Sequence, residues 1–417
     1  MRTIDHVRER TEEDAHMRIK ETVRRALTTA GVVMSACSLV AAMASAGAAA
    51  STKGHDPYLY ADTRIDNPAT IGGAGSTFAA PLQNAAQAFY TSRNSRASIN
   101  GYQAVGSGTG EADILKKVVD WGGTDVPMQQ KDIIKSEPSG ANYTLSDFLQ
   151  VPIALGGVAI AYNVPGLKDK ALVLNANVLS WIYDGQVTYW NSKVIQGLNK
   201  GVKLPHARIV VVARGDSSGT TFIFTNFLHA AAPKAWPTIP SKVPLTLPTG
   251  GIAGNGNAGV AADVQGTPDS IGYVEYSYLL LNPNLLKGVA SIVNKSGKAV
   301  QPTLAGVAAA AAARPGVSAT GFSIVYQWGS KTYPIAGYTW AVIWKQNQTS
   351  DAEGTLLVKY LDWLAHSGAI NGTTAGQDVA IQQGYVPLPA NIQQLARTTL
   401  LQCTGSHGQA LLTTTGA

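Results

Sequence analysis

Several short apolar runs in the sequence are each followed by a glycine-rich turn and then by a helical pattern. This repeated order restricts the fold more than any other feature of the sequence. Residues 69–78, "ATIGGAGSTF", lead into the helical pattern of 79–92. Residues 98–110, "SINGYQAVGSGTG", and 207–219, "ARIVVVARGDSSG", lead into two more helical patterns. Strands that feed helices through such turns are typical of α/β units. The sequence therefore predicts an α/β fold.

Composition narrows the class of protein. Apolar residues make up 45% of the 417 residues and charged residues 14%, as expected for a globular chain that can form two or more domains. The formal charge of +6 is spread along the sequence, so we expect no nucleic-acid partner. The two cysteines, Cys37 and Cys403, and the scattered histidines show no metal-binding spacing. We expect neither a metal nor a cofactor.

The N-terminal region reads as a targeting segment. Residues 26–52 carry no charge, follow the basic residues of 18–25 and end in small residues with A-x-A cleavage patterns at 44–46 and 48–50. This pattern predicts a signal peptide over 1–50, starting from Met1 or Met17, and a protein that works in the periplasm or another extracytoplasmic space. Two alternatives stay open: a lipid anchor at Cys37, and an uncleaved membrane span.

Three strand-to-helix junctions offer glycine and hydroxyl residues where a helix begins: 75–78, 106–110 and 217–220. The first N–H groups of a helix lack partners within it, and the helix dipole is positive there. Helix capping explains any one such junction. Three of them, one with Arg214 just upstream, favour a site for a tetrahedral oxyanion. Asp125, in "VDWGGTDVP", is either a helix cap before Pro127 or part of this site.

At these residues the chain resembles the extracytoplasmic phosphate-binding proteins of ABC-type phosphate importers. The resemblance rests on "GAGSTFAAPL", "YQAVGSGTGEADI", "VDWGGTDVP", "PIALGGVAIAYNVPGL", "LSWIYDGQVTYWN", "VVARGDSSGTTFIFTNFL", "GNAGVAADVQ" and "IGYVEYSY", in this order. It implies a two-lobed α/β fold of the class II binding-protein type, in which each lobe is a mostly parallel sheet flanked by helices and the ligand lies in the cleft. The polar lead-in is then 51–67, lobe I is 68–150 plus 276–417, and lobe II is 151–275.

The resemblance also implies the ligand contacts, the partners and the role of the protein. The protein would bind inorganic phosphate and deliver it to membrane permease and ATPase subunits, as a monomer without enzymatic activity. Asp125 would accept the proton of the phosphate, Asp216 would orient Arg214, and Ser76 would have a supporting role. The implied phosphate-binding residues are Thr77, Phe78, Ser107, Asp125, Arg214, Ser218, Gly219 and Thr220.

Residues 214–220 allow three other interpretations. A serine hydrolase would need a histidine base and an acid beside Ser217 or Ser218, and no segment of the sequence suggests them. An adhesion tripeptide would need Arg214 and Asp216 exposed on a loop. A receptor for sulfate or molybdate stays open within the binding class. The family usually has glycine where Ser217 stands, and residues 305–316, rich in alanine, form either a helix that Pro315 ends or a linker.

Overall fold

The computed structural model describes residues 65–413, except 168, 170–171, 347–349, 368 and 371–372. The predicted signal peptide, with Cys37 and both cleavage sites, lies outside the described residues, as does most of the polar lead-in. Within the described ranges, we found no helix that combines the length and the apolar character needed to cross a membrane.

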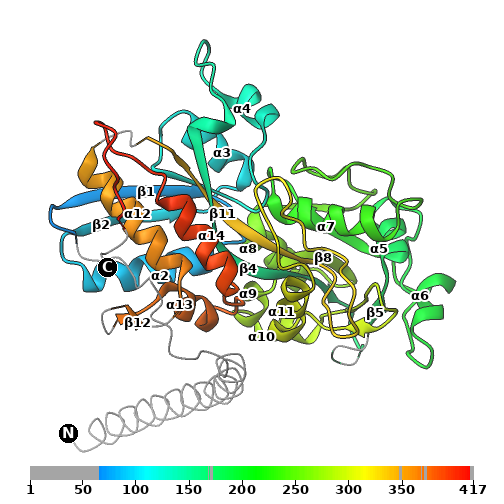
Figure 1. Ribbon diagram of the computed structural model, residues 1–417. Helices are drawn as coiled ribbons and strands as arrows, with labels where there is room; N and C mark the ends of the chain where they lie inside the picture. Colours follow the sequence, from blue (N-terminus) through cyan, green and yellow to red (C-terminus); the bar gives the residue numbers. More distant parts are fainter. Residues whose placement is uncertain are drawn as a thin grey trace, which may run out of the picture. The chain divides into compact units, whose positions relative to one another are not determined.

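Eight strands form one mixed sheet (Figure 1). Across the sheet they are β2 (Ala97–Gln103), β1 (Ala69–Gly75), β3 (Trp121–Thr124), β11 (Ala336–Trp344), β4 (Phe148–Asn163), β8 (Ser270–Glu275), β6 (Val210–Arg214) and β7 (Ile252–Gly254). The first three strands are parallel to one another, and so are the last three. The antiparallel strands β11 and β4 join these two parallel groups.

Strand β4 belongs to both halves of the sheet. Its residues through Gly157 pair with β11, and its residues from Val158 pair with β8. We name the part of the molecule built on β2, β1, β3, β11 and the first part of β4 lobe I. The part built on the rest of β4, β8, β6 and β7 is lobe II. The apolar run 151–163 lies within this one long strand, and both of its faces are buried.

Helices pack on both halves of the sheet, as expected for an α/β fold (Figure 1). Lobe I carries α2 (Ala80–Arg93), α3 (Ser107–Leu115), α4 (Gln130–Ser136), α12 (Asp351–Ala365), α13 (Gly376–Gln382), α14 (Ala390–Leu400) and the short 3₁₀ helix η1 (Leu145–Asp147). Lobe II carries α5 (Ala176–Tyr183), α6 (Lys193–Leu198), α7 (Gly219–Ala231), α8 (Gly256–Gly266), α9 (Ser277–Leu280), α10 (Pro283–Lys287) and α11 (Leu304–Ala313).

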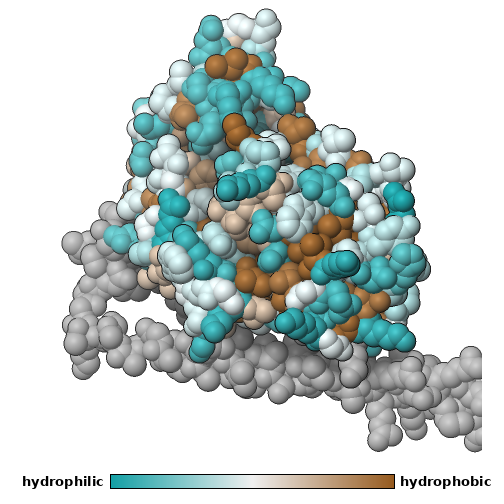
Figure 2. Space-filling model, turned by 90° about the vertical axis from the view of Figure 1, so that its right-hand side faces the viewer, coloured by the Kyte–Doolittle hydropathy of each residue, from teal (hydrophilic) through white to brown (hydrophobic). Residues whose placement is uncertain are grey.

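Two small sheets complete the described structure. One contains β10 (Ala299–Val300), β9 (Ser291–Val293) and β5 (Val173–Leu174), and the other contains β12 (Ala369–Ile370) and β13 (Thr373–Thr374). The alanine-rich segment is the helix α11, capped by the Thr303 hydroxyl, so the helix interpretation is confirmed and the linker interpretation is wrong. Figure 2 views the lobe II end, where hydrophobic residues gather in the lower half among hydrophilic ones.

The strand pairings differ from the limits predicted for lobe II. Val151 pairs with Ala341 of β11 inside lobe I, so β4 enters lobe II only at Val158. Beyond Glu275 the chain stays with lobe II, because β9 pairs with β5 and Val289 bridges to β4. It returns to lobe I at β11. These limits depend on backbone pairing between distant strands, which local sequence patterns do not encode.

Candidate functional site

The carboxyl ends of the parallel strands lead into one site. β1 ends at Gly75, directly before Ser76, and β3 ends at Thr124, directly before Asp125. β6 ends with Arg214 itself. In open α/β sheets, ligands bind beyond the carboxyl ends of such strands. Hydrogen bonds and close approaches between these loops show that the sheet topology brings them together.

The three glycine- and hydroxyl-rich junctions lie at or just before helix starts. Helix α3 begins at Ser107, and α7 begins at Gly219 with the Ser218 hydroxyl accepting the backbone N–H of Thr221 at 3.1 Å. Residues 76–78 lie directly before Ala79, the N-cap of α2. The starts of α3 and α7 meet each other, because the Ser107 hydroxyl accepts the backbone N–H of Gly219 at 3.1 Å. Backbone donors of both lobes therefore face one region.

Arg214 is the cation of this region, and it is only 2% exposed. Its Nε donates to Oδ1 of Asp216 at 2.6 Å, a second guanidinium nitrogen donates to Oδ2, and Nη1 donates to the Thr220 hydroxyl at 3.3 Å. Burial acts to raise the pKa of Asp216, but the hydrogen bonds and charge of Arg214 hold that pKa below its ordinary value. This burial rules out the exposed adhesion tripeptide. The ion pair fixes the direction of the guanidinium.

Asn257, near the start of α8, links hydroxyl groups of the two lobes. Its side-chain Nδ2 donates to the hydroxyl oxygens of Thr77 at 2.9 Å and Thr220 at 3.0 Å, and its backbone N–H also donates to Thr77. Arg214 donates to Thr220 as well, so each threonine oxygen already accepts two hydrogen bonds. The protons of both hydroxyls are left to donate, as an oxyanion site requires.

Asp125 lies at the bottom of the same region and is 2% exposed. The Ser76 hydroxyl donates to its Oδ1 at 2.5 Å and accepts the backbone N–H of Phe78 at 3.0 Å. Burial raises the pKa of Asp125 to about 6, although Ser76, other hydroxyls and Arg214 act in the opposite direction. The helix-cap interpretation is wrong, because α4 begins at Gln130 and its N-cap is Gln129. Asp125 is thus a buried acceptor above about pH 6.

At Gly219, lobe II approaches Asp125 of lobe I closely. A Cβ at this position would lie 2.5 Å from both Cβ and Oδ2 of Asp125 and 2.7 Å from the Ser107 hydroxyl oxygen. No larger side chain fits at such separations. The glycine therefore lets the start of α7 reach the carboxylate and the start of α3 together.

Ser217 departs from the glycine usual in the resembling family, and the structure shows how it fits. Its backbone carbonyl accepts the N–H of Gly108 at 3.4 Å, and its hydroxyl lies over that glycine. A Cβ at residue 108 would be 2.1 Å from the Ser217 hydroxyl oxygen. The serine is accommodated because position 108 has no side chain.

Two tyrosines hold the backbone that precedes α2. The Tyr278 hydroxyl donates to the carbonyl of Thr77 at 2.7 Å, and the Tyr385 hydroxyl donates to the carbonyl of Phe78 at 2.5 Å. Glu275 anchors the start of α9 beside them, since its Oε2 accepts the backbone N–H of Ser277 at 2.8 Å. Burial raises the pKa of Glu275 to about 8. The Tyr278 contact fixes the peptide unit that carries the predicted N–H donor of Phe78, and the Tyr385 contact fixes the peptide unit that follows it.

All eight predicted binding residues are buried, and together with Ser76 and Asp216 they form this one region. Their role in binding a ligand stays a prediction. Sequence reasoning missed Asn257, Tyr278 and Tyr385 as structural partners of the site. Asn257 lies in the motif "GNAGVAADVQ", where its place beside a glycine was the available signal. Tyr278 lies in "IGYVEYSY", where its place after a predicted strand was the available signal. Tyr385 had no such signal.

The sequence of this chain matches a family model and is similar to known phosphate-binding proteins. Residues 47–367 match the model of the PBP superfamily domain. The phosphate-binding protein PstS of Pasteurella multocida is 32% identical over 345 residues, which cover 82% of this chain and 93% of that protein. The phosphate-binding protein PstS of Haemophilus influenzae is 30% identical over 325 residues, which cover 78% and 90%.

Solved structures share the fold. A high affinity periplasmic phosphate-binding protein (PfluDING) bound with phosphate has a TM-score of 0.63 at 22% sequence identity, over 80% of this chain and 94% of that chain. A phosphate-binding protein from Stenotrophomonas maltophilia has a TM-score of 0.59 at 21% identity, over 79% and 93%. At these identities the likeness concerns the fold alone.

Proposed function

This chain belongs to the PstS family of phosphate-binding proteins, and we propose that it captures inorganic phosphate outside the cytoplasm for an ABC-type importer. Its partners in transport are the membrane permease and ATPase subunits of that importer. It acts as a binding protein, as a monomer and without catalysis.

One observation carries the proposal: a buried arginine, two helix starts and a buried carboxylate meet in one region. Arg214 and the start of α7 neutralise a doubly or singly charged oxyanion. Thr77 and Thr220 donate their hydroxyl protons to it. Asp125 is an acceptor, and it suits an oxyanion that still carries a proton. Phosphate has such a proton near neutral pH, and sulfate has none.

The remaining predicted residues supply donors around the ligand. Phe78 and Gly219 contribute backbone N–H groups, and Ser107 and Ser218 contribute hydroxyls. In the phosphate complex, the N–H groups of Phe78 and Gly219 turn from Ser76 and Ser107 toward the ligand. Asp216 keeps the Arg214 fork in one orientation.

Calorimetry of the purified protein with phosphate, arsenate and sulfate tests the proposal. We expect one phosphate per chain, similar binding of arsenate and far weaker binding of sulfate. Tight sulfate binding with no heat from phosphate would contradict it. Hydrolysis of an ester or peptide that disappears in Ser218→Ala would also contradict the non-enzymatic role.

Lobe closure is part of the same proposal, because the site residues come from both lobes. Gly157 and Val158 of β4, the end of β8 and the start of β11 are the strand crossings at which the lobes would turn. Small-angle scattering with and without phosphate measures this motion. We expect a smaller radius of gyration with phosphate, and an unchanged radius would count against closure.

A further inference from the structure

Lys242 connects lobe II to lobe I beside the proposed phosphate site. It lies in the segment between α7 and β7, and its side chain is only 12% exposed. Its Nζ donates to Oε2 of Glu111 on α3 at 2.5 Å and lies 3.5 Å from Oδ1 of Asp132 on α4. A lobe II cation therefore sits between two lobe I carboxylates.

Glu111 is tied to the lobe I half of the site. It lies one helical turn after Ser107, so both residues are on one face of α3. Its Oε1 accepts the hydroxyl of Thr124 at 2.7 Å, and Thr124 directly precedes Asp125. Burial raises the pKa of Glu111, and Lys242 is the strongest influence that lowers it. A buried carboxylate in this position needs the charge of Lys242.

The backbone of Lys242 is tied to the lobe II half of the site. Its carbonyl accepts the N–H of Ser218 at 2.8 Å. Ser218 is the N-cap of α7, whose start reaches Ser107 and Asp125. Lys242 thus contacts the N-cap residue of α7 through its backbone and the carboxylate of Glu111 on α3 through its side chain.

From this geometry we propose that Lys242 is a positioning residue that holds the two lobes closed over the ligand. The proposal rests on the proposed function, because it assigns a residue to the retention of phosphate. Lobe opening separates Lys242 from Glu111 and Asp132, so this ion pair exists only in the closed state. An interaction present in one state alone shifts the equilibrium toward that state. Lys242 therefore slows phosphate release without touching phosphate.

The test compares Lys242→Met, Lys242→Arg and Glu111→Gln with the wild-type protein by calorimetry and stopped-flow fluorescence. Lys242→Met should weaken phosphate binding by at least about tenfold, as for loss of a charge-assisted hydrogen bond. This loss of affinity should result from a faster dissociation rate with a nearly unchanged association rate, because association begins with open lobes. Lys242→Arg should recover most of the affinity, since it retains the charge.

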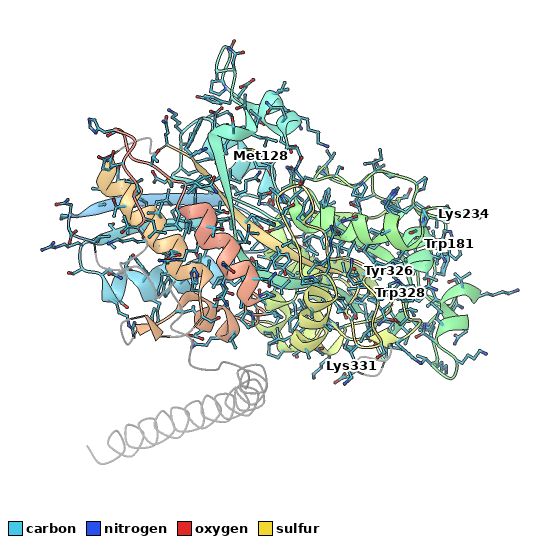
Figure 3. The ribbon with its side chains drawn as sticks, in the orientation of Figure 1. Met128, Trp181, Lys234, Tyr326, Trp328 and Lys331 are labelled. Atoms are coloured by element: carbon cyan, nitrogen blue, oxygen red, sulfur yellow. The ribbon has the colours of Figure 1, made fainter. Side chains whose placement is uncertain are left out.

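Lys234→Met is the matched control. Lys234 lies in the same inter-element segment but is exposed, and Figure 3 places it at the lobe II end, well separated from Met128 near α4. The Lys234→Met protein should bind phosphate with the affinity of the wild type. A Lys242→Met protein with the affinity and dissociation rate of this control would overturn the proposal. So would a drop in ligand-free melting temperature with no change in affinity, which is the result of a merely structural role.

The double variant Lys242→Met/Glu111→Gln tests the pair itself. We expect it to lose little more affinity than the worse single variant, because both changes break one interaction. Losses that simply add would overturn the pairing.

Spin labels at the exposed Ser139 and Lys200 report the separation of the lobes directly. We expect Lys242→Met to widen the distance distribution of the ligand-free protein, and no widening would overturn the proposal. If wild-type protein binds no phosphate, the proposed function fails, and this measurement still decides the role of Lys242.

Discussion

The two lobes differ in the charges that they place in and beside the candidate site. Lobe I supplies the buried carboxylates Asp125 and Glu111, whereas lobe II supplies Lys242 and the cation Arg214, which is paired with Asp216 of the same lobe. An anion in contact with lobe II meets a guanidinium and the start of α7, which attract any oxyanion of suitable size. The same anion meets an acceptor on lobe I. We therefore propose that lobe II provides most of the affinity for the oxyanion and that lobe I provides the selectivity between oxyanions.

The environments of the two aspartates near the site sharpen this difference. Asp216 of lobe II is bonded to Arg214, and its pKa stays below the ordinary value despite burial. Asp125 of lobe I is buried and accepts the hydroxyl of Ser76, and burial raises its pKa to about 6. Asp216 therefore orients a cation, while Asp125 remains available to a proton on the ligand.

The largest expected effect is on lobe II. Arg214→Ala should weaken phosphate and arsenate binding by up to about 100-fold, because a buried charge-assisted bond is worth roughly 1.5–3 kcal/mol. Arg214→Lys should lower the affinity less, since lysine keeps the charge but lacks the planar guanidinium with its two parallel N–H donors. Calorimetric titrations of both variants measure this. Unchanged affinity in both variants would show that Arg214 does not bind the ligand, and it would contradict the proposal that lobe II provides the affinity.

On lobe I, we expect a change in selectivity. Asp125→Asn offers sulfate a donor where the wild type offers only an acceptor, so sulfate affinity should rise by at least about tenfold, or 1.4 kcal/mol. Phosphate affinity should change less. Paired titrations at one pH and one salt concentration give the ratio. The same phosphate-to-sulfate ratio in both proteins would exclude Asp125 as the selective group.

Lowering the pH should imitate that substitution in part. The pKa of Asp125 lies at about 6, so the group is a carboxylate above this pH and a carboxylic acid below it. Protonation supplies a donor to sulfate and removes the acceptor for the phosphate proton. Between about pH 7.5 and about pH 5, the phosphate-to-sulfate affinity ratio should therefore fall by about fivefold, well within the roughly 300-fold change in the carboxylate-to-acid ratio that titration of a single group allows over this range. Asp125→Asn should show no such fall, and a similar slope in that variant would assign the titration to another group.

The smallest effect is expected at Ser217, where the lobes are in contact away from Arg214 and Asp125. Ser217→Gly removes a hydroxyl that lies over Gly108 and leaves the backbone contact between residues 108 and 217 in place. Phosphate affinity should stay within about threefold of the wild type, since surface substitutions rarely exceed a few tenths of a kcal/mol. Calorimetry detects a larger change, which would show that contact between lobes matters beyond charge.

Much of the site was predictable because its residues are grouped in the sequence. The starts of α3 and α7 were predicted from glycine and hydroxyl residues after strands, and Arg214 stands next to one of them. Helix-start chemistry is local, since it depends on the few N–H groups of the first turn. The same local reasoning left a helix cap open as one of two roles for Asp125, because the following Val-Pro pair suggested a helix from about Pro127. The helix α4 begins later, at Gln130, so this alternative was wrong.

The partners between lobes were not predictable in this way. Asn257 joins Thr77 to Thr220 across 180 and 37 residues of sequence, and Lys242 reaches Glu111 across 131 residues. Nothing in the segment around Lys242 separates it from the exposed Lys234. A polar side chain that binds a distant partner carries no local signature, because its neighbours in the chain do not determine its neighbours in space.

The sequence by itself determined the α/β class, the starts of α3 and α7, and the chemistry of an oxyanion site, because strand, turn and capping preferences act over a few residues. Only the tertiary structure decided that β4 is one strand shared by both lobes and that chain segments far apart close around Asp125. It also decided which lysine lies between two carboxylates. Those features depend on strand order and on the approach of the lobes, which are set by packing of the whole chain.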